Sequence, residues 1–463
     1  MYRHAAAALI FALALPGLGA AQTAPRLNVT YTQFTLPNGL TVIVHEDHRV
    51  PLVSTNIWYH VGSAREKPGR TGFAHLFEHL MFEGSAHVKE GEFDTLLEAT
   101  GGNNNGSTTS DRTNYWIDVP SNAVELALFL ESDRMGWLLD VMSPARVNGQ
   151  RDVVKNERRQ SYENRPYGGA EILLDEMLWP KTFPYHWPTI GYMEDLTAAS
   201  YEDVVEFFKK YYGPANASLV IAGDINTERA RTLAKKWFGD IKPSQPVLPI
   251  DAAPVVLTSV NTQTITDRVQ LPRLYLAWVT PAQFRPGDAM LDVVSQVLAG
   301  GKNARLYKRL VYDLQIAQDV TAFQASAALG SSYQIIVTPR LDRQGGKPVT
   351  PQAAVDEVRA IVDEELQKLR DEPPSERELQ RAVNQIEASF YDGIEQVGGF
   401  GGKADRLNAY YTATGDPDYF NEDLSRYRAL AATDVQAAVR AYLPQDRRVE
   451  LTVMPAAPRA PQP

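Results

Sequence analysis

The 463-residue chain contains no cysteine, and the last of its eight histidines is His186. The absence of cysteine excludes disulfide bridges, thiolate metal sites and cysteine nucleophiles. Any metal ion must therefore be held by nitrogen and oxygen ligands, and a histidine-based site must lie in the first half of the chain. Basic residues are also in deficit, because 46 Lys and Arg against 56 Asp and Glu give a formal net charge of −10. Such an acidic chain is a poor candidate for nucleic-acid binding, which needs clustered basic residues.

Long apolar runs are missing except at the N-terminus. Arg3 and His4 precede an unbroken apolar run over residues 5–15, and small residues follow at 19–21. This order is typical of a secretory signal peptide, so we expect residues 1–21 to be removed. The alternative, a membrane anchor, is disfavoured because the run is too short to span a bilayer comfortably. We expect a periplasmic or secreted protein that does not insert into a membrane after signal removal.

A proline-rich stretch over residues 241–250 divides the mature chain nearly in half. Both halves mix strand and helix patterns, which favours an α+β fold class. We predict an N-terminal domain over 28–240, a linker over 241–256, a C-terminal domain over 257–454 and a disordered tail over 455–463.

A weak internal repeat relates the two halves. A helical pattern that ends at Tyr211 is followed by a proline and an apolar strand, and the same order recurs after a helical pattern that ends at Tyr442. The offset, 442 − 211 = 231 residues, is about half of the chain. Two common helix–strand units can coincide by chance, but duplication explains this offset. We predict two similar domains related by duplication, each a mostly antiparallel sheet with helices packed on one face.

One segment has the spacing of a metal site, because His75, Glu78 and His79 stand in the order His-x-x-Glu-His. On a helix over residues 71–83, the two histidines lie one turn apart on one face, so both imidazoles can reach one zinc ion. Glu78 lies on the other side of His75, where it can address a water molecule without being a ligand. The opposite face is apolar and suited to packing; it carries Phe73, Leu76, Phe77, Leu80 and Met81.

Two histidines do not complete a catalytic zinc site, which usually has three protein ligands. Without cysteine, the third ligand must be His, Asp or Glu, and the pattern alone does not choose among them. The candidates are His45, His48, His60, His87 and the three acids of the segment 151–163. Each candidate also has an ordinary explanation, as a strand or loop surface residue or as part of a solvated helix.

Further motifs accompany this segment over nearly the whole mature chain. They are Val61-Gly-Ser-Ala-Arg-Glu66, Gly72 to His79, Met81-Phe-Glu-Gly84, Gly101-Gly102 with Asn105, Thr108, Asp111 and Tyr115, Ile190-Gly191 with Leu196, Tyr212 to Asp224, and Leu298 to Tyr307. Together they resemble the pitrilysin/insulinase family of zinc peptidases, in the branch of mitochondrial processing peptidase and its bacterial relatives.

The resemblance implies that His75, His79 and Glu157 hold one zinc ion per chain, with a water molecule in the fourth position. Glu157 lies 157 − 79 = 78 residues after His79, where the family has its third ligand. Glu78 is then the catalytic base, which takes a proton from that water and passes it to the leaving amine. Gln150 stands where many relatives have Glu, and we expect it to influence how the metal ligands are oriented.

The resemblance also implies how a substrate binds. A peptide or unfolded polypeptide adds as a strand to an exposed sheet edge, and main-chain hydrogen bonds give affinity with loose side-chain preference. The expected edge residues are Asn104, Asn105, Gly106, Ser107 and Thr108. The alternative is an ordinary polar loop.

Active relatives complete the site with an Arg and a Tyr, seven residues apart, from a second domain. The matching positions here are Val311 and Gln318, and neither side chain can replace its counterpart. Arg309 and Tyr312 lie nearby at the wrong spacing. The pattern resembles the catalytic subunit of heterodimeric members, so we expect a homologous zinc-free partner that carries the Arg/Tyr pair and closes a chamber around the substrate.

Two other classes of function stay open. Some relatives are non-catalytic scaffolds or processing-peptidase-like subunits of larger assemblies, although a scaffold has no physical need for a complete metal set and Glu78. A zinc hydrolase that acts on other bonds is also compatible with the fold, since fold does not determine chemistry.

Overall fold

The computed structural model describes residues 26–343 and 346–457. The predicted signal peptide and most of the predicted tail lie outside the described residues. Within the described ranges, no helix is long and apolar enough to cross a membrane.

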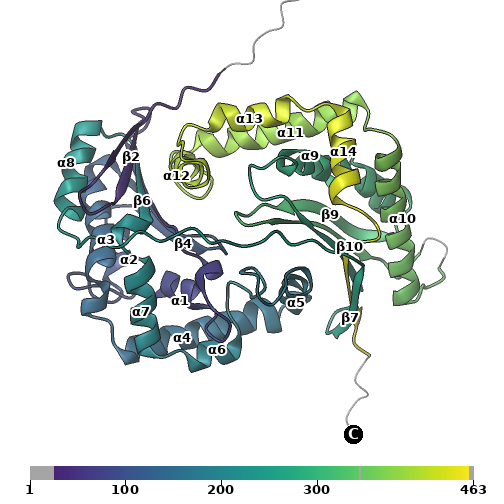
Figure 1. Cartoon of the computed structure of the whole chain (residues 1–463), viewed down its shortest axis with the longest axis horizontal. Coiled ribbons are helices and arrows are strands. Elements are labelled where there is room, and N and C mark those ends of the chain that lie inside the picture. The colour runs from purple at the N-terminus through teal and green to yellow at the C-terminus, as the bar shows by residue number, and fades with distance from the viewer. Residues whose placement is uncertain (1–25, 344–345, 458–463) are drawn as a thin grey trace, which may run out of the picture.

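Two sheets form the framework, one from each half of the sequence (Figure 1). The first has the strand order β1-β2-β6-β3-β5-β4, and its neighbours are antiparallel except for the parallel pair β2 and β6. Strand β4 lies at an edge and pairs only with β5. The strands are β1 (Thr32–Thr35), β2 (Thr41–Glu46), β3 (Leu52–Tyr59), β4 (Asn103–Thr108), β5 (Thr113–Pro120) and β6 (Ala217–Gly223).

The second sheet repeats this topology. Its order is β7-β11-β8-β10-β9, which is the path β2-β6-β3-β5-β4 of the first sheet with the parallel pair again at the start. The predicted α+β fold class of two similar, mostly antiparallel domains is therefore confirmed. The strands are β7 (Asn261–Asp267), β8 (Arg273–Thr280), β9 (Ala317–Ala325), β10 (Ser331–Pro339) and β11 (Val449–Pro455).

The helices complete the two halves. The first half contains α1 (Phe73–Leu80), α2 (Glu92–Glu98), α3 (Val124–Trp137), α4 (Pro144–Arg158), α5 (Gly168–Leu178), α6 (Met193–Ala198), α7 (Tyr201–Tyr211) and α8 (Thr227–Phe238). The second contains α9 (Asp288–Ala299), α10 (Pro351–Asp371), α11 (Glu376–Glu395), α12 (Lys403–Thr414), α13 (Phe420–Arg428) and α14 (Ala432–Tyr442). Short 3₁₀ turns lie at Ser63–Arg65, Ser121–Ala123, Leu138–Asp140 and Pro214–Asn216, and π-helical turns at Arg159–Glu163 and Tyr307–Asp313.

Two predicted boundaries differ from the structure. Helix α1 begins at Phe73 and ends at Leu80, inside the predicted range 71–83. Gly72 before it adopts a left-handed φ of 87°, and after Leu80 the N–H groups of Phe82 and Glu83 bond carbonyls three residues back, which is a tighter turn. The predicted tail begins one residue too early, since Pro455 is the last residue of β11 and pairs with Asp267 of β7.

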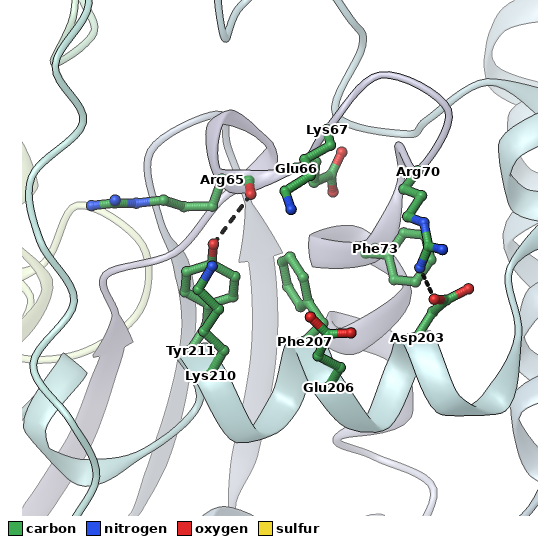
Figure 2. A pocket seen from close by; sticks show the side chains of 10 residues that line it. All are labelled: Arg65, Glu66, Lys67, Arg70, Phe73, Asp203, Glu206, Phe207, Lys210 and Tyr211. Atoms are coloured by element: carbon green, nitrogen blue, oxygen red, sulfur yellow. Dashed lines mark hydrogen bonds and ion pairs between the residues drawn. The ribbon is translucent and has the colours of Figure 1, made fainter.

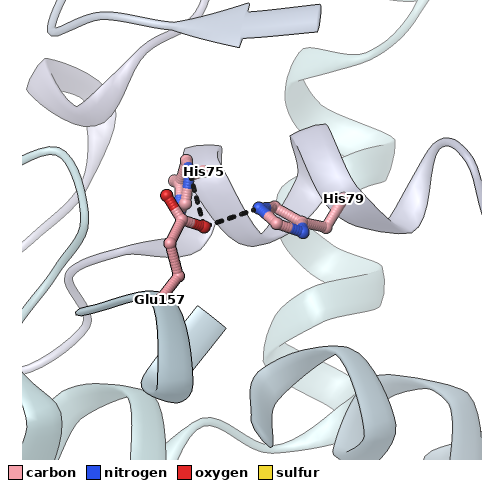
Figure 3. Close-up of side chains that lie close together, drawn as sticks. All are labelled: His75, His79 and Glu157. Atoms are coloured by element: carbon pink, nitrogen blue, oxygen red, sulfur yellow. Dashed lines mark ion pairs between the residues drawn. The ribbon is translucent and has the colours of Figure 1, made fainter. Parts of the chain in front are cut away.

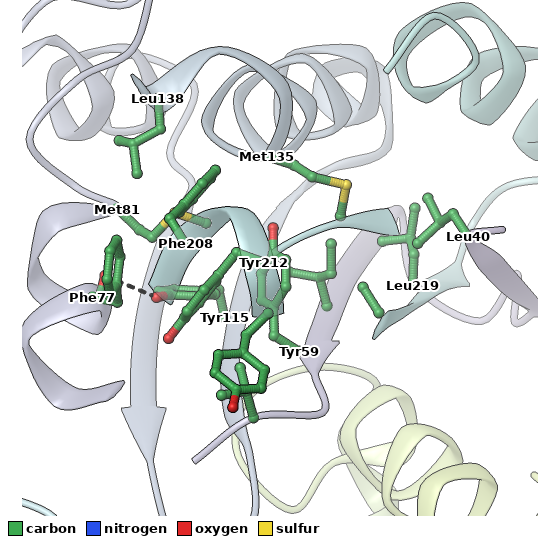
Figure 4. Close-up of a cluster of buried hydrophobic side chains, with 14 of the residues drawn as sticks. Leu40, Tyr59, Phe77, Met81, Tyr115, Met135, Leu138, Phe208, Tyr212 and Leu219 are labelled. Atoms are coloured by element: carbon green, nitrogen blue, oxygen red, sulfur yellow. Dashed lines mark hydrogen bonds between the residues drawn. The ribbon is translucent and has the colours of Figure 1, made fainter. Parts of the chain in front are cut away.

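The apolar side of α1 packs into the core of the first half (Figure 4). The Phe77 and Tyr212 rings pack in a tilted arrangement with centroids 5.0 Å apart, and the Tyr115 hydroxyl donates a 3.3 Å hydrogen bond to the Phe77 carbonyl. The predicted packing face of this helix is buried throughout, with at most 3% exposure at Phe73, Leu76, Phe77, Leu80 and Met81. The opposite, polar face of α1 is therefore free to carry a site.

The two halves exchange helices across their interface. Helix α12 of the second half packs on β3 and β6, and helix α5 of the first half packs on β8 and β11 (Figure 1). Leu407 lies in one shared cluster with Val220, and Leu174 lies in another with Leu451. Each sheet is thus covered by its own helices on one face and by a helix from the other half on the opposite face.

Candidate metal centre

The start of α1 is held by backbone contacts and a buried carboxylate. Gly72 lies so close to Gly191 that a side chain on Gly191 would sit 2.5 Å from the Gly72 Cα. The carboxylate of Glu66 accepts hydrogen bonds from the N–H groups of Gly72, at 2.9 Å, and Ala74, at 2.8 Å. It thereby satisfies donors that the first turn of a helix leaves unpaired. Burial raises the pKa of Glu66 to about 8, although these backbone hydrogen bonds act in the opposite direction.

Two histidines of α1 converge with one glutamate of α4 (Figure 3). The Glu157 Oε2 atom lies 3.7 Å from His75 Nε2 and 3.2 Å from His79 Nε2. Potential ligand atoms of all three residues lie within 4.8 Å of one another, and no other such group of His, Asp and Glu occurs in the part of the chain that the structure describes.

The ionisation of this group suits metal binding. Burial is the main cause that lowers the pKa of His75 to about 4, so its imidazole is neutral and keeps a free lone pair. The hydrogen bond with His79 is the main cause that lowers the pKa of Glu157, so its carboxylate is charged. Neutral imidazole and carboxylate are the forms that ligate metal ions. Two imidazole nitrogens and one carboxylate oxygen on fixed helices fit a zinc ion with one open position.

Glu157 lies near the C-terminal end of α4, and the contacts of this helix end orient it toward the histidines. Helix α4 passes directly into the π-helical turn Arg159–Glu163, a wider turn that is frequent at functional sites. Beside it, Arg158 donates a 2.5 Å hydrogen bond to the Gly191 carbonyl and lies 3.4 Å from Glu163. The end of α4 is therefore attached to the same loop that packs against the start of α1.

Glu78 points to the same region but is engaged differently. The Thr108 hydroxyl donates a 2.6 Å hydrogen bond to its Oε2 atom. Burial is the main cause that raises the pKa of Glu78, and the Thr108 hydrogen bond acts against it. A carboxylate next to a metal-binding group, but held by another partner, has the position of a general base.

Sequence comparison places this geometry in a known family. Residues 41–180 match the profile of Insulinase (Peptidase family M16), and residues 198–386 match that of the Peptidase M16 inactive domain. The chain belongs to peptidase family M16. The zinc protease PqqE of Helicobacter pylori is 27% identical over 453 residues, covering 95% of this chain and 96% of the relative.

Solved structures agree with this M16 assignment. A protease from Helicobacter pylori matches with a TM-score of 0.83 and 25% identity, over 92% of this chain and all of that one. The periplasmic protease PqqL of Escherichia coli has the same fold, with a TM-score of 0.72 and 17% identity. That match covers 94% of this M16 chain but only 50% of PqqL, so PqqL is about twice as long.

The residues predicted to bind a peptide all lie on β4 of the M16 fold. Asn104, Asn105, Gly106, Ser107 and Thr108 belong to this edge strand, which lies beside α1. Gly106 leaves little room there, because a Cβ atom would lie 3.2 Å from Glu78 Cγ. The residues form a strand and not a loop, while peptide binding itself stays a prediction.

The other sequence candidates lie elsewhere. Gln150 is on α4 and hydrogen-bonds Glu83 instead of a member of the metal-binding group. The alternative histidine ligands all have partners away from it: His45 with Thr30, His48 with Asp224, His60 with Ser218 and His87 with Asp133. Within the segment 151–163, only Glu157 joins His75 and His79 among the described residues.

The residues that occupy the positions of the missing Arg/Tyr pair cannot replace that pair. Val311 packs against the core of the second half, and Gln318 is exposed on β9. The Arg309 guanidinium donates hydrogen bonds to two carboxylates of α10, to Glu364 at 2.5 Å and to Glu365 at 2.6 Å. Arg309 is thus committed to a structural ion pair.

A separate cavity of about 300 Å³ lies between the loop before α1 and helix α7 (Figure 2). Its charged side chains are partly paired with each other, as Arg70 is with Asp203. It holds no histidine and lies on the packing side of α1, where Phe73 lines it. The acids that line it do not form a metal-binding group among the described residues.

Sequence reasoning missed two parts of the site. The motif over residues 61–66 includes Glu66, but its role as the cap of α1 depends on a turn that no periodicity reveals. Thr108 is named as a substrate contact, whereas the structure shows it as the hydrogen-bond donor to Glu78. No sequence pattern links these two residues, which are 30 positions apart.

Proposed function

We propose that this chain is a zinc-dependent endopeptidase. The observation that carries the proposal is the convergence of His75, His79 and Glu157, with Glu78 beside them but held by Thr108. A scaffold has no need for a buried base next to three metal ligands. M16 relatives that are named zinc proteases, among them PqqE of Helicobacter pylori, support the same activity.

The side chains would divide the reaction among them. His75, His79 and Glu157 would hold the zinc ion, which would supply Lewis acidity at the scissile carbonyl and at the attacking water. Glu78 takes a proton from the attacking water and returns it to the leaving amine. The burial that raises the pKa of Glu78 makes it a better proton acceptor than an exposed carboxylate. Thr108 keeps this carboxylate oriented through the cycle.

The substrate would be an extended peptide or an unfolded polypeptide. The open edge of β4 offers main-chain donors and acceptors beside Glu78, and a bound strand would place a peptide bond there. Main-chain recognition of this kind requires an extended segment, so folded proteins would be excluded.

We further propose that a second, zinc-free subunit supplies the Arg/Tyr pair and closes the chamber. Val311 and Gln318 cannot play these roles. This chain matches only half of PqqL, which is about twice as long. That length supports a complete unit built from two parts, each the size of this chain. PqqL is described as periplasmic, and the N-terminal pattern supports the same location or secretion for this chain.

Cleavage of an internally quenched, unstructured peptide tests this proposal. The zinc-loaded chain is assayed alone, with Glu78→Gln as the control. Zinc binding without cleavage supports the need for a partner, and addition of the homologous subunit should then restore activity. Cleavage by the wild type alone shows that the partner is unnecessary. A chain that neither binds zinc nor cleaves, even with the partner, favours the scaffold.

The proposed export has its own test. N-terminal sequencing of the mature protein from its host should find Gln22 as the first residue. An intact N-terminus would contradict export through a cleaved signal peptide.

A further inference from the structure

Strand β4 needs support from outside its own sheet. It lies at an edge, pairs only with β5, and has the sequence Asn-Asn-Asn-Gly-Ser-Thr, which has little intrinsic preference for strands. Its side chains alternate between the two faces of the sheet. Thr108 lies on the face of α1 and bonds Glu78, while Ser107 lies on the opposite face, where α12 of the second half packs.

On that opposite face, one carboxylate of the second half gathers several donors of the first sheet. The Asp405 Oδ1 atom on α12 accepts hydrogen bonds from Trp58 Nε1 at 3.0 Å, Asn56 Nδ2 at 3.2 Å and Asn114 Nδ2 at 2.9 Å. Its other oxygen accepts from the Gly401 N–H at 2.9 Å. Both oxygens of Asp405 are therefore committed.

The contact continues from Asn114 to the edge strand. Because Asn114 donates its amide to Asp405, its Oδ1 atom points the other way and accepts a 2.7 Å hydrogen bond from the Ser107 hydroxyl. Arg112 completes the arrangement by donating to the Ser107 hydroxyl at 2.7 Å and the Ser107 carbonyl at 2.8 Å. Its guanidinium lies 5.1 Å from the centre of the Trp58 ring.

We propose that Asp405 is a positioning residue for the peptidase site, acting from the second half through Asn114 and Ser107. It fixes the amide orientation of Asn114, and this amide fixes Ser107. Ser107 is the neighbour of Thr108, so the same hydrogen-bond chain sets the distance of β4 from Glu78 on the other face. The second half lacks a metal-binding group among the described residues, yet it helps to shape the edge where the substrate is to bind.

Part of this inference rests on the proposed peptidase function, and part does not. The first readout needs no activity: hydrogen exchange of the segment 103–109, compared between the wild type and Asp405→Asn. We expect exchange about tenfold faster in the variant, the factor that corresponds to one lost charge-assisted hydrogen bond. Asp392→Asn, an exposed acid on α11, is the matched control and should exchange like the wild type. Equal exchange of the edge strand in Asp405→Asn and the wild type overturns the inference.

The second readout is kinetic. With the quenched peptide and the active assembly, Asp405→Asn should raise KM about tenfold and also lower kcat, because a displaced β4 weakens the substrate strand and shifts the base that Thr108 holds. A purely structural role would lower the melting temperature and leave KM unchanged, and that result overturns the inference. If no form of the protein cleaves, the proposed function fails, and the exchange measurement still decides the role of Asp405.

A second variant guards against misfolding of the first. Ser107→Ala cuts the same hydrogen-bond chain at β4 and leaves all contacts of Asp405 in place. It should reproduce the faster exchange and the higher KM. In the double variant the two effects should not add, because both remove one connection. Additive effects would show that the two residues act independently.

Discussion

Thr108 donates a 2.6 Å hydrogen bond to Glu78, and this contact joins the edge of the first sheet to the helix that carries His75 and His79. The strand proposed to hold the substrate and the carboxylate proposed to move the proton are therefore directly linked. A shift of β4 changes the position of the base as well as that of the peptide. This coupling explains why contacts on the far face of β4, such as those of Asp405, matter for the site.

Replacement of the base separates metal binding from chemistry. Glu78→Gln should keep one zinc ion per chain, because Glu78 is not among the three ligands. It should lower kcat by at least about 100-fold, the usual contribution of a positioned acid–base group. Zinc content by mass spectrometry and peptide cleavage by the active assembly measure the two effects. A fully active variant would mean that another residue is the base.

Replacement of the third ligand should remove the metal. Glu157→Gln should hold substoichiometric zinc and lose activity by more than the roughly 10–100-fold that the loss of an outer partner costs. Asp152→Asn, which changes an exposed acid on the same helix α4, is the matched control and should retain zinc. A chelator should inactivate the wild type, and added zinc should restore it. Normal zinc content in Glu157→Gln would show that Glu157 is not a zinc ligand.

Space beside the base is limiting at Gly106. A Cβ atom there would lie 3.0 Å from the Tyr115 ring and 3.2 Å from Glu78 Cγ, so Gly106→Ala must displace one of them. We expect kcat to fall about tenfold, because small displacements of a catalytic group are costly. Gly149→Ala is the control, since nothing lies within 4 Å of a Cβ on that helical residue. Unchanged kinetics in Gly106→Ala would show that the base tolerates the shift.

Stability should depend on pH through Asp175 on α5. Burial is the main cause that raises its pKa from 3.8 to about 7. Between these pH values the folded chain holds a proton that the unfolded chain releases, so this residue makes stability fall as pH rises. Asp175→Asn removes that loss. The free energy of unfolding of the variant, compared with the wild type, should therefore be about 1–3 kcal/mol more favourable at pH 8 than at pH 4.

Denaturant titrations at several pH values check this prediction. Glu202→Gln is the control, because it changes an exposed acid on α7 that is not among the causes of the raised pKa of Asp175. If Asp175→Asn and the wild type have the same dependence of stability on pH, Asp175 is not the origin of that dependence.

Local patterns predicted the elements well where the signal was periodic. The apolar face of α1 and the helix–strand repeat are correct, because burial on one side imposes a period on the sequence. Boundaries were less accurate, since the left-handed Gly72 before α1 and the tighter turns after Leu80 carry no periodic signal. The repeat predicted duplication but not the exchange of α5 and α12, because cross-packing depends on how the two halves dock.

The sequence by itself determined the pair His75 and His79, the neighbouring Glu78 and the two-domain α+β class, because these depend on helical spacing and on repetition along the chain. Resemblance to a family was needed to choose Glu157 among several acids. Only the tertiary structure decided that Glu157 meets the histidines, that Thr108 holds Glu78 and that Asp405 reaches β4 from the second half. These contacts join residues far apart in sequence, and they exist only once the helices and sheets have packed.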